Sequence, residues 1–96
     1  MKEQQLREKL REHLAGREIW FSPRVKWQQC DIWGWADGIW LDDYGIPVFF
    51  QLTTASNMSA RRKKINHWLS ENDFTAPIYL YGYDKKKKEF KIEKLN

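Results

Sequence analysis

The sequence predicts an α/β (α+β) domain, because helical and strand-like patterns of apolar residues alternate along the chain. Leu6, Leu10 and Leu14 recur every four residues, which is the spacing of one face of a helix. An almost continuous apolar run over residues 46–54 is typical of a central strand that is covered on both faces. The expected order is α-β-β-β-α-β-β, with a mixed sheet flanked by two helices.

Turn and capping residues divide the chain into these elements. Gly16 is a natural stop for the first helix, and Pro23 restricts the far end of the first strand to an edge or a bend. Asp42 to Gly45 has the composition of a hairpin turn, and Ser56 or Ser59 can cap the second helix. The expected elements are a helix at 2–15, strands at 18–25, 31–41 and 46–54, a helix to about residue 70, and strands at 77–83 and 89–95.

The length of 96 residues is that of one domain, so we expect residues 1–96 to share a single core. Six Trp, five Phe and four Tyr supply much buried area for so short a chain. No apolar run approaches the roughly 20 residues of a membrane span, and no apolar segment of a signal peptide is evident. A soluble, intracellular (cytoplasmic) protein without membrane partners is therefore expected.

The composition restricts the kind of metal site that the chain can form. Cys30 is the single cysteine, which excludes an internal disulfide and a thiolate metal site. His13 and His67 lie far apart, and each is most simply a residue on a helix surface. Carboxylates and carbonyl groups must then hold any metal, and these oxygen ligands favour Mg²⁺ or Mn²⁺ over zinc.

The charge of +4 is concentrated in two runs, at residues 61–64 and 85–88. Basic surfaces attract phosphate groups, but a basic run on a helix is also a common form of solvated surface. The lysine run at 85–88 has a simple structural explanation, because a charged turn discourages pairing at a sheet edge.

Strand alternation predicts where polar side chains gather. It places Asp31 and Asp37 on one side of the second strand, and Gln51 and Thr53 on one side of the third. If the 42–45 turn pairs these strands, the Asp37 carboxylate, the Gln51 amide and the Leu52 carbonyl can together hold a divalent ion. The alternatives are that Asp37 belongs to a bulge, and that Gln51 and Thr53 are polar only because the strand leaves the core there.

Three short segments resemble motifs of the PD-(D/E)xK nuclease superfamily. They are Gly34-Trp35-Ala36-Asp37, Gln51-Leu52-Thr53 and Ser56-Asn57-Met58-Ser59-Ala60-Arg61. The similarity is greatest to the small phage-type and Holliday-junction-resolvase-like members. It implies a restriction-endonuclease-like core, in which a helix, a three-stranded meander, a second helix and a further strand follow one another.

The resemblance implies roles for particular residues. Asp37 takes the position of the metal-binding aspartate, Gln51 that of the second acidic ligand, and Thr53 that of the usual lysine. Since threonine carries no charge, Arg61 or Lys64 on the next helix is expected to act in place of the lysine.

Further acid and nucleic-acid contacts are also expected. Asp31 or Glu3 is a possible additional acid. The expected nucleic-acid contacts are Arg61, Arg62, Lys63 and Lys64, with Trp33 and Trp35 as aromatic surfaces on which unpaired bases stack.

The implied activity is that of a Mg²⁺- or Mn²⁺-dependent endonuclease that hydrolyses DNA phosphodiester bonds, with some selectivity for substrate structure and a possible homodimer. Two alternatives to this nuclease stay open. In the first, the chain is a catalytically degenerate module of the same fold that binds nucleic acid. In the second, it is a small protein-interaction domain that uses its exposed aromatic residues.

Overall fold

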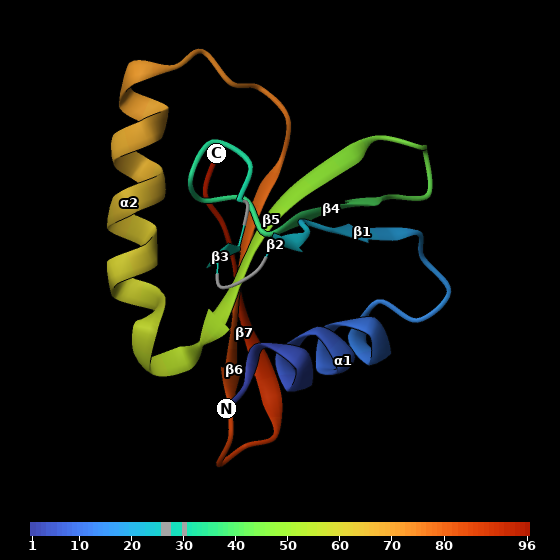
Figure 1. Ribbon diagram of the computed structural model, residues 1–96. Coiled ribbons are helices and arrows are strands. Elements are labelled where there is room, and N and C mark those ends of the chain that lie inside the picture. Colours follow the sequence, from blue (N-terminus) through green and yellow to red (C-terminus); the bar gives the residue numbers. More distant parts are fainter. Residues whose placement is uncertain (26–27, 30) are drawn as a thin grey trace.

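The computed structural model describes residues 1–25, 28–29 and 31–96, so Cys30 lies outside the described residues. Its two helices and main sheet follow the expected order, with a short additional hairpin (Figure 1). The elements are α1 (Glu3–His13), β1 (Ile19–Phe21), β2 (Arg24–Val25), β3 (Gln28–Gln29), β4 (Gly38–Leu41), β5 (Pro47–Thr54), the 3₁₀ turn η1 (Ala55–Asn57), α2 (Met58–Glu71), β6 (Ile78–Asp84) and β7 (Glu89–Lys94).

The main sheet has five strands in the order β1-β4-β5-β6-β7. Strands β1, β4 and β5 form an antiparallel meander, β5 and β6 are parallel, and β7 returns antiparallel to β6. The parallel pair requires a crossover connection, and α2 provides it. Strands β2 and β3 pair only with each other among the described strands.

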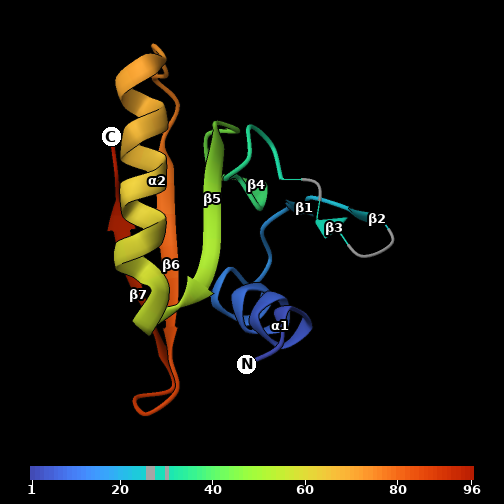
Figure 2. The same cartoon turned by 60° about the vertical axis from the view of Figure 1, so that its left-hand side comes forward.

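The sheet lies between the two helices, α1 on one face and α2 on the other (Figure 2). The leucine stripe of α1 packs against alternate residues of β5, namely Val48, Phe50 and Leu52. Phe49, which points to the opposite face, packs in a second cluster with Ile65 of α2. The prediction that the third strand is central and covered on both faces is confirmed. No helix in the described ranges is long and apolar enough to cross a membrane.

The first helix matches its prediction closely. Leu6, Leu10 and Leu14 are buried, whereas Glu8 and Glu12 are exposed on the far side. Gly16 follows with a φ of +83°, a backbone conformation that favours glycine, and the chain turns there into β1.

The prediction of one strand over 31–41 is wrong in its first half. Only Gly38–Leu41 is a strand, and the preceding residues form a closed loop in which the Ala36 amide donates to the Ile32 carbonyl at 2.9 Å. Trp33 and Gly34 have φ values of 54° and 75°, so strand alternation does not apply to this loop. Packing of the loop tryptophans against Trp68 of α2 replaces the expected pleat.

Smaller differences concern the residues at which individual strands and helices begin and end. The predicted 18–25 strand is interrupted at Ser22 and Pro23, which separate β1 from β2. Neither Ser56 nor Ser59 is the N-cap of α2; Asn57 occupies that position after η1, and no side chain caps the helix. The last two strands lie within a residue of their predicted bounds.

Two glycines allow close packing beside the sheet, and they provide a matched test of the fold. A Cβ at Gly38 would meet the Trp20 backbone carbonyl and lie 2.6 Å from Phe50 Cζ, whereas one at Gly82 would first meet the flexible Met58 side chain. We expect Gly38→Ala to lower the free energy of unfolding by roughly 1–3 kcal/mol, as overpacking does, and Gly82→Ala to lower it less. Urea denaturation measures both, and the reverse ranking would contradict this packing.

Candidate functional site

The carboxyl group of Asp37 is inserted between β4 and β5. The Asp37 amide donates to the Phe50 carbonyl at 2.8 Å, and its carbonyl accepts from the Ser22 amide at 2.8 Å. Its Oδ2 accepts a hydrogen bond of 2.7 Å from the Leu52 amide. The side chain is 4% exposed, so strands on both sides fix its position.

Gln51 follows Phe50, the last residue of β5 that pairs with β4, and Asp37 directly precedes β4. Gln51 is 2% exposed, and its Oε1 is buried without a hydrogen-bond partner among the described residues. Thr53, two residues further on the same face, is also buried and pairs with Gly82 of β6. The register of β4 against β5 begins at Gly38 and Phe50, and the Asp37 amide also donates to the Phe50 carbonyl, so Asp37 and Gly38 both stand opposite Phe50, as in a bulge. The expectation that strand pairing brings Asp37 beside Gln51 stays a prediction.

Asp31 reaches the same place by a different route from the expected one. The closed loop returns it to Asp37, and the two carboxyl groups share a side-chain hydrogen bond. The Oδ1 atom of Asp31 is buried and has no other partner in the described part of the chain. Glu3 of α1 interacts electrostatically with Asp37. Its Oε1 atom forms an ion pair with Arg7 Nε at 3.4 Å, and Arg7 also donates to the Ser22 carbonyl at 3.0 Å.

Burial raises the pKa of the Asp37 carboxyl to about 8 from its usual 3.8. The hydrogen bond from the Leu52 amide opposes this shift, and the negative charges of Asp31 and Glu3 add to it. At neutral pH the group therefore holds a proton that a bound cation would displace.

Two buried oxygen atoms are of the kind that a hard cation prefers. The Oδ1 atom of Asp31 and the Oε1 atom of Gln51 are buried without a hydrogen-bond partner among the described residues. Orphaned buried acceptors of this kind are costly unless water or an ion satisfies them. Among the described residues, no three His, Cys, Asp or Glu side chains are placed to hold a metal together. Any ion here would therefore use two carboxylates with neutral oxygens.

The basic run on α2 divides between two sides of the helix. Arg62 is paired with Glu93 of β7, with its Nε 2.7 Å from Oε2, so its charge is already neutralised. At 100° per residue, Arg61 and Lys64 lie on the opposite shoulder of the helix, together with Trp68. No ion pair involves Arg61, Lys63 or Lys64 in the described ranges. By the same rotation the exposed Lys63 falls on the outer side of α2, away from Arg61 and Lys64, so this geometry does not support the prediction that Lys63 contacts nucleic acid together with them.

The shoulder with Arg61 and Lys64 faces the Asp37 side of the molecule. α2 runs back alongside β5 (Figure 1), and the pairing of Arg62 with Glu93 of β7 places the opposite shoulder of the helix on the β5 side. Trp68, one turn beyond Lys64, stacks on Trp33 at 5.3 Å, which links this shoulder to the loop that ends at Asp37.

The two loop tryptophans differ in accessibility. Trp33 is 50% exposed, whereas Trp35 is 1% exposed and packs with Ala36, Ile65 and Ile78. The prediction that Trp35 offers a stacking surface to nucleic acid is wrong, because the closed loop turns its ring into the core.

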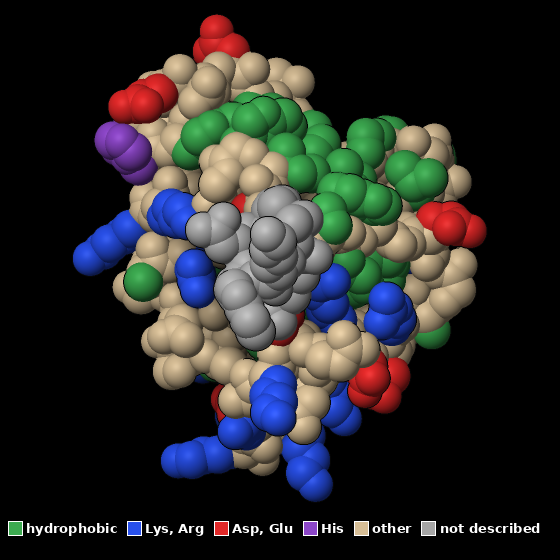
Figure 3. Space-filling model, viewed as in Figure 1, with side chains coloured by type: hydrophobic (Ala, Val, Ile, Leu, Met, Phe, Trp, Pro, Cys, Tyr) green, Lys and Arg blue, Asp and Glu red, His purple; other side chains and the backbone are tan. Residues whose placement is uncertain are grey.

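Lysine and arginine side chains spread over α2 and the β6–β7 turn on the face that Figure 3 shows.

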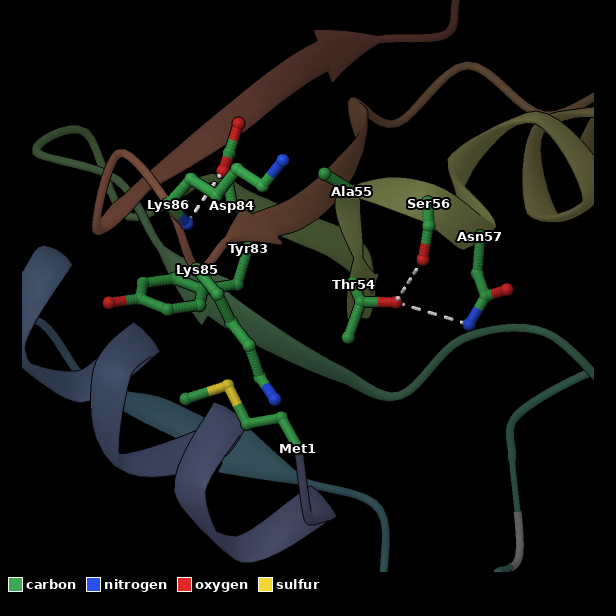
Figure 4. A pocket seen from close by; sticks show the side chains of 9 residues that line it. All are labelled: Met1, Thr54, Ala55, Ser56, Asn57, Tyr83, Asp84, Lys85 and Lys86. Atoms are coloured by element: carbon green, nitrogen blue, oxygen red, sulfur yellow. Dashed lines mark hydrogen bonds between the residues drawn. The ribbon is translucent and has the colours of Figure 1, made fainter.

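A separate cavity of about 490 Å³ lies at the carboxyl ends of β5 and β6. Figure 4 shows Lys85 extending across it toward Met1, opposite the Thr54 hydroxyl, which bonds Ser56 at 3.2 Å and Asn57 at 3.1 Å. Asp37, Gln51 and Asp31 do not line this cavity. The sequence predicts only a charged turn for Lys85 to Lys88. Their place beside parallel strand ends is apparent only once the crossover topology is known.

No protein-family model, curated protein or solved structure matches this chain.

The raised pKa of Asp37 predicts how stability depends on pH. Between pH 3.8 and about 8 the unfolded chain loses the Asp37 proton while the folded chain keeps it. The free energy of unfolding should therefore fall as pH rises through this range, by at most about 1.4 kcal/mol per pH unit for one proton. Urea denaturation of the metal-free protein checks this. Asp37→Asn should flatten the dependence and the exposed control Asp73→Asn should not; equal slopes in all three would contradict the assignment.

Proposed function

We propose that this chain is a divalent-metal-dependent nuclease that hydrolyses DNA phosphodiester bonds. The observation that carries the proposal is the hydrogen bond between the buried carboxyl groups of Asp37 and Asp31, with Asp37 also bound to the Leu52 amide next to Gln51. The basic residues Arg61 and Lys64 lie on the helix that follows this strand. Acidic oxygens next to unpaired cations are the combination that phosphoryl chemistry needs, because the first hold a metal and the second neutralise phosphate charge.

The order of elements supports the same proposal. A helix, an antiparallel three-stranded meander, a crossover helix and a parallel strand correspond to the core implied by the PD-(D/E)xK resemblance. In that core the metal-binding aspartate and the second ligand stand on neighbouring strands; here Asp37 directly precedes β4, and Gln51 lies in the neighbouring β5.

The residues present fit Mg²⁺ or Mn²⁺. Asp37 and Asp31 would supply charged oxygens, and the Gln51 amide and the Leu52 carbonyl neutral ones, all of the kind these ions prefer. When bound, the ion would polarise the scissile phosphate and lower the pKa of an attacking water. The Leu52 amide, which donates to Asp37 Oδ2, holds that carboxyl in place.

The remaining side chains act on the substrate itself. Arg61 and Lys64 neutralise the negative charge of the phosphate. The buried Thr53 hydroxyl orients a phosphate oxygen or a water molecule, where a lysine would add charge. Glu3 is paired with Arg7 and acts on the site through its charge.

The same residues favour one rival function. Gln51 and Thr53 are both neutral, which weakens metal binding and removes one cation from the site relative to the family pattern. A module that binds DNA and no longer cuts it would keep Arg61 and Lys64. The difference between the two functions is measurable as metal-dependent cleavage.

The direct test is cleavage of supercoiled plasmid and branched DNA with Mg²⁺ or Mn²⁺. We expect Asp37→Asn to reduce the cleavage rate by at least about 100-fold, the order seen when charge stabilisation in a transition state is lost. Lys64→Ala should lower the rate and the outward-pointing control Lys63→Ala should leave it unchanged. DNA binding without cutting by the unaltered protein would establish the degenerate module instead.

Metal binding can be tested without any activity. Gln51→Glu adds a buried acid next to Leu52, whose amide binds Asp37, so we expect it to lower the melting temperature in the absence of metal, through charge repulsion and burial. Saturating Mn²⁺ should raise the melting temperature of this variant more than that of the unaltered protein, and should have no effect on Asp37→Asn. Equal Mn²⁺ effects in all three proteins would count against a metal at this place.

A further inference from the structure

We infer that Trp33 stacks an unpaired base of the nucleic acid, with Lys64 and Arg61 contacting the adjoining phosphates. The substrate class would then be single-stranded DNA, or DNA with unpaired nucleotides beside the scissile bond. This inference rests on the proposed function and adds to it the structure of the substrate.

One face of the Trp33 ring is already supported. The ring stacks on Trp68 with centroids 5.3 Å apart and planes 28° apart, and Phe49 and Phe74 contact it at 5.4 Å each. Half of the residue is nevertheless exposed. A large aromatic ring fixed from beneath and open on the outside loses little freedom when a base stacks on it.

The backbone holds the ring in this position at a cost. Trp33 has a φ of 54°, in the left-handed region that side chains other than glycine rarely adopt. The following Gly34 is also left-handed, and the loop is closed by the two hydrogen bonds between Ile32 and Ala36. The same loop begins with Asp31 and ends beside Asp37, so the exposed ring and the acidic pair are parts of one short segment.

The charge next to the ring indicates the occupant. Lys64 stands one helical turn from Trp68, in the same row of α2, and Arg61 lies one turn before it. An aromatic platform flanked by two cations that have no ion pair in the described part of the chain suits a base with its phosphates.

Trp20 provides a natural comparison, because it is equally exposed, at 50%. It lies in the edge strand β1 beside an apolar hollow lined by Glu18, Ile19, Ile39 and Leu41. Its setting therefore supplies a negative charge where that of Trp33 supplies two positive ones. If exposure of a tryptophan were enough for base stacking, substitutions at Trp20 and Trp33 would weaken binding equally.

The experiment measures binding in an Asp37→Asn background, so that cleavage does not interfere. The probes are fluorescein-labelled oligo-dT and a blunt duplex of the same length, followed by fluorescence anisotropy. We expect Trp33→Ala to weaken oligo-dT binding by roughly 5- to 150-fold, the equivalent of one base stack. Duplex binding should change little. Trp20→Ala should change neither, and Trp33→Phe should keep most of the affinity.

A matched lysine pair tests the phosphate contact. Lys64→Ala should weaken oligo-dT binding and reduce its salt dependence, whereas Lys63→Ala should do neither. Both lysines are exposed, so these variants should fold normally even if Trp33→Ala does not.

The outcomes separate this inference from the proposed function. Equal losses for Trp33→Ala and Trp20→Ala, equal losses on oligo-dT and duplex, or no oligo-dT binding at all would overturn the stacking role. None of these results bears on whether the unaltered protein, with Asp37 in place, cuts DNA in the presence of metal. If Trp33-dependent binding is found and the unaltered protein cuts no DNA, the stacking site stands and the nuclease proposal fails.

Discussion

The insertion of the Asp37 carboxyl between β4 and β5 is the constraint on which the site depends. The Leu52 amide donates a hydrogen bond to it, while burial and the neighbouring acids Asp31 and Glu3 destabilise its charged form. A buried acid in such surroundings is unfavourable for folding alone. Under the proposed function, this position would keep a cation-binding group in a dry, prearranged place, at some expense in stability at neutral pH.

The sequence was sufficient for those parts of the fold in which local periodicity and packing agree. The leucine stripe defines α1, and the continuous apolar run defines β5 as the central strand, because each pattern reflects burial that the element itself experiences. The segment 31–36 was mispredicted since its alternation resembles a strand. Its real conformation depends on Trp33 and Trp35 meeting Trp68, a contact with a helix more than thirty residues away that no local pattern reveals.

The candidate site was predictable to a similar degree. The turn at Asp42 to Gly45 sets the register of β4 against β5, so the approach of Asp37 to the end of β5 could be anticipated from the spacing. The return of Asp31 through a closed loop could not be. Nor could the ion pair that removes Arg62 from the free basic surface, because it depends on the position of β7 in the sheet. The position of β7 decides which side of α2 is neutralised, because Glu93 of this strand pairs with Arg62.

Anomalous diffraction from crystals grown with Mn²⁺ tests most directly whether a metal ion binds at Asp37. We expect a peak in contact with the Asp37 carboxylate, at roughly 2.2 Å, with Asp31 and the Gln51 amide oxygen as further ligands. The same crystals of Asp37→Asn should lack that peak. An empty Asp37 position, with manganese bound elsewhere or absent, would contradict the claim.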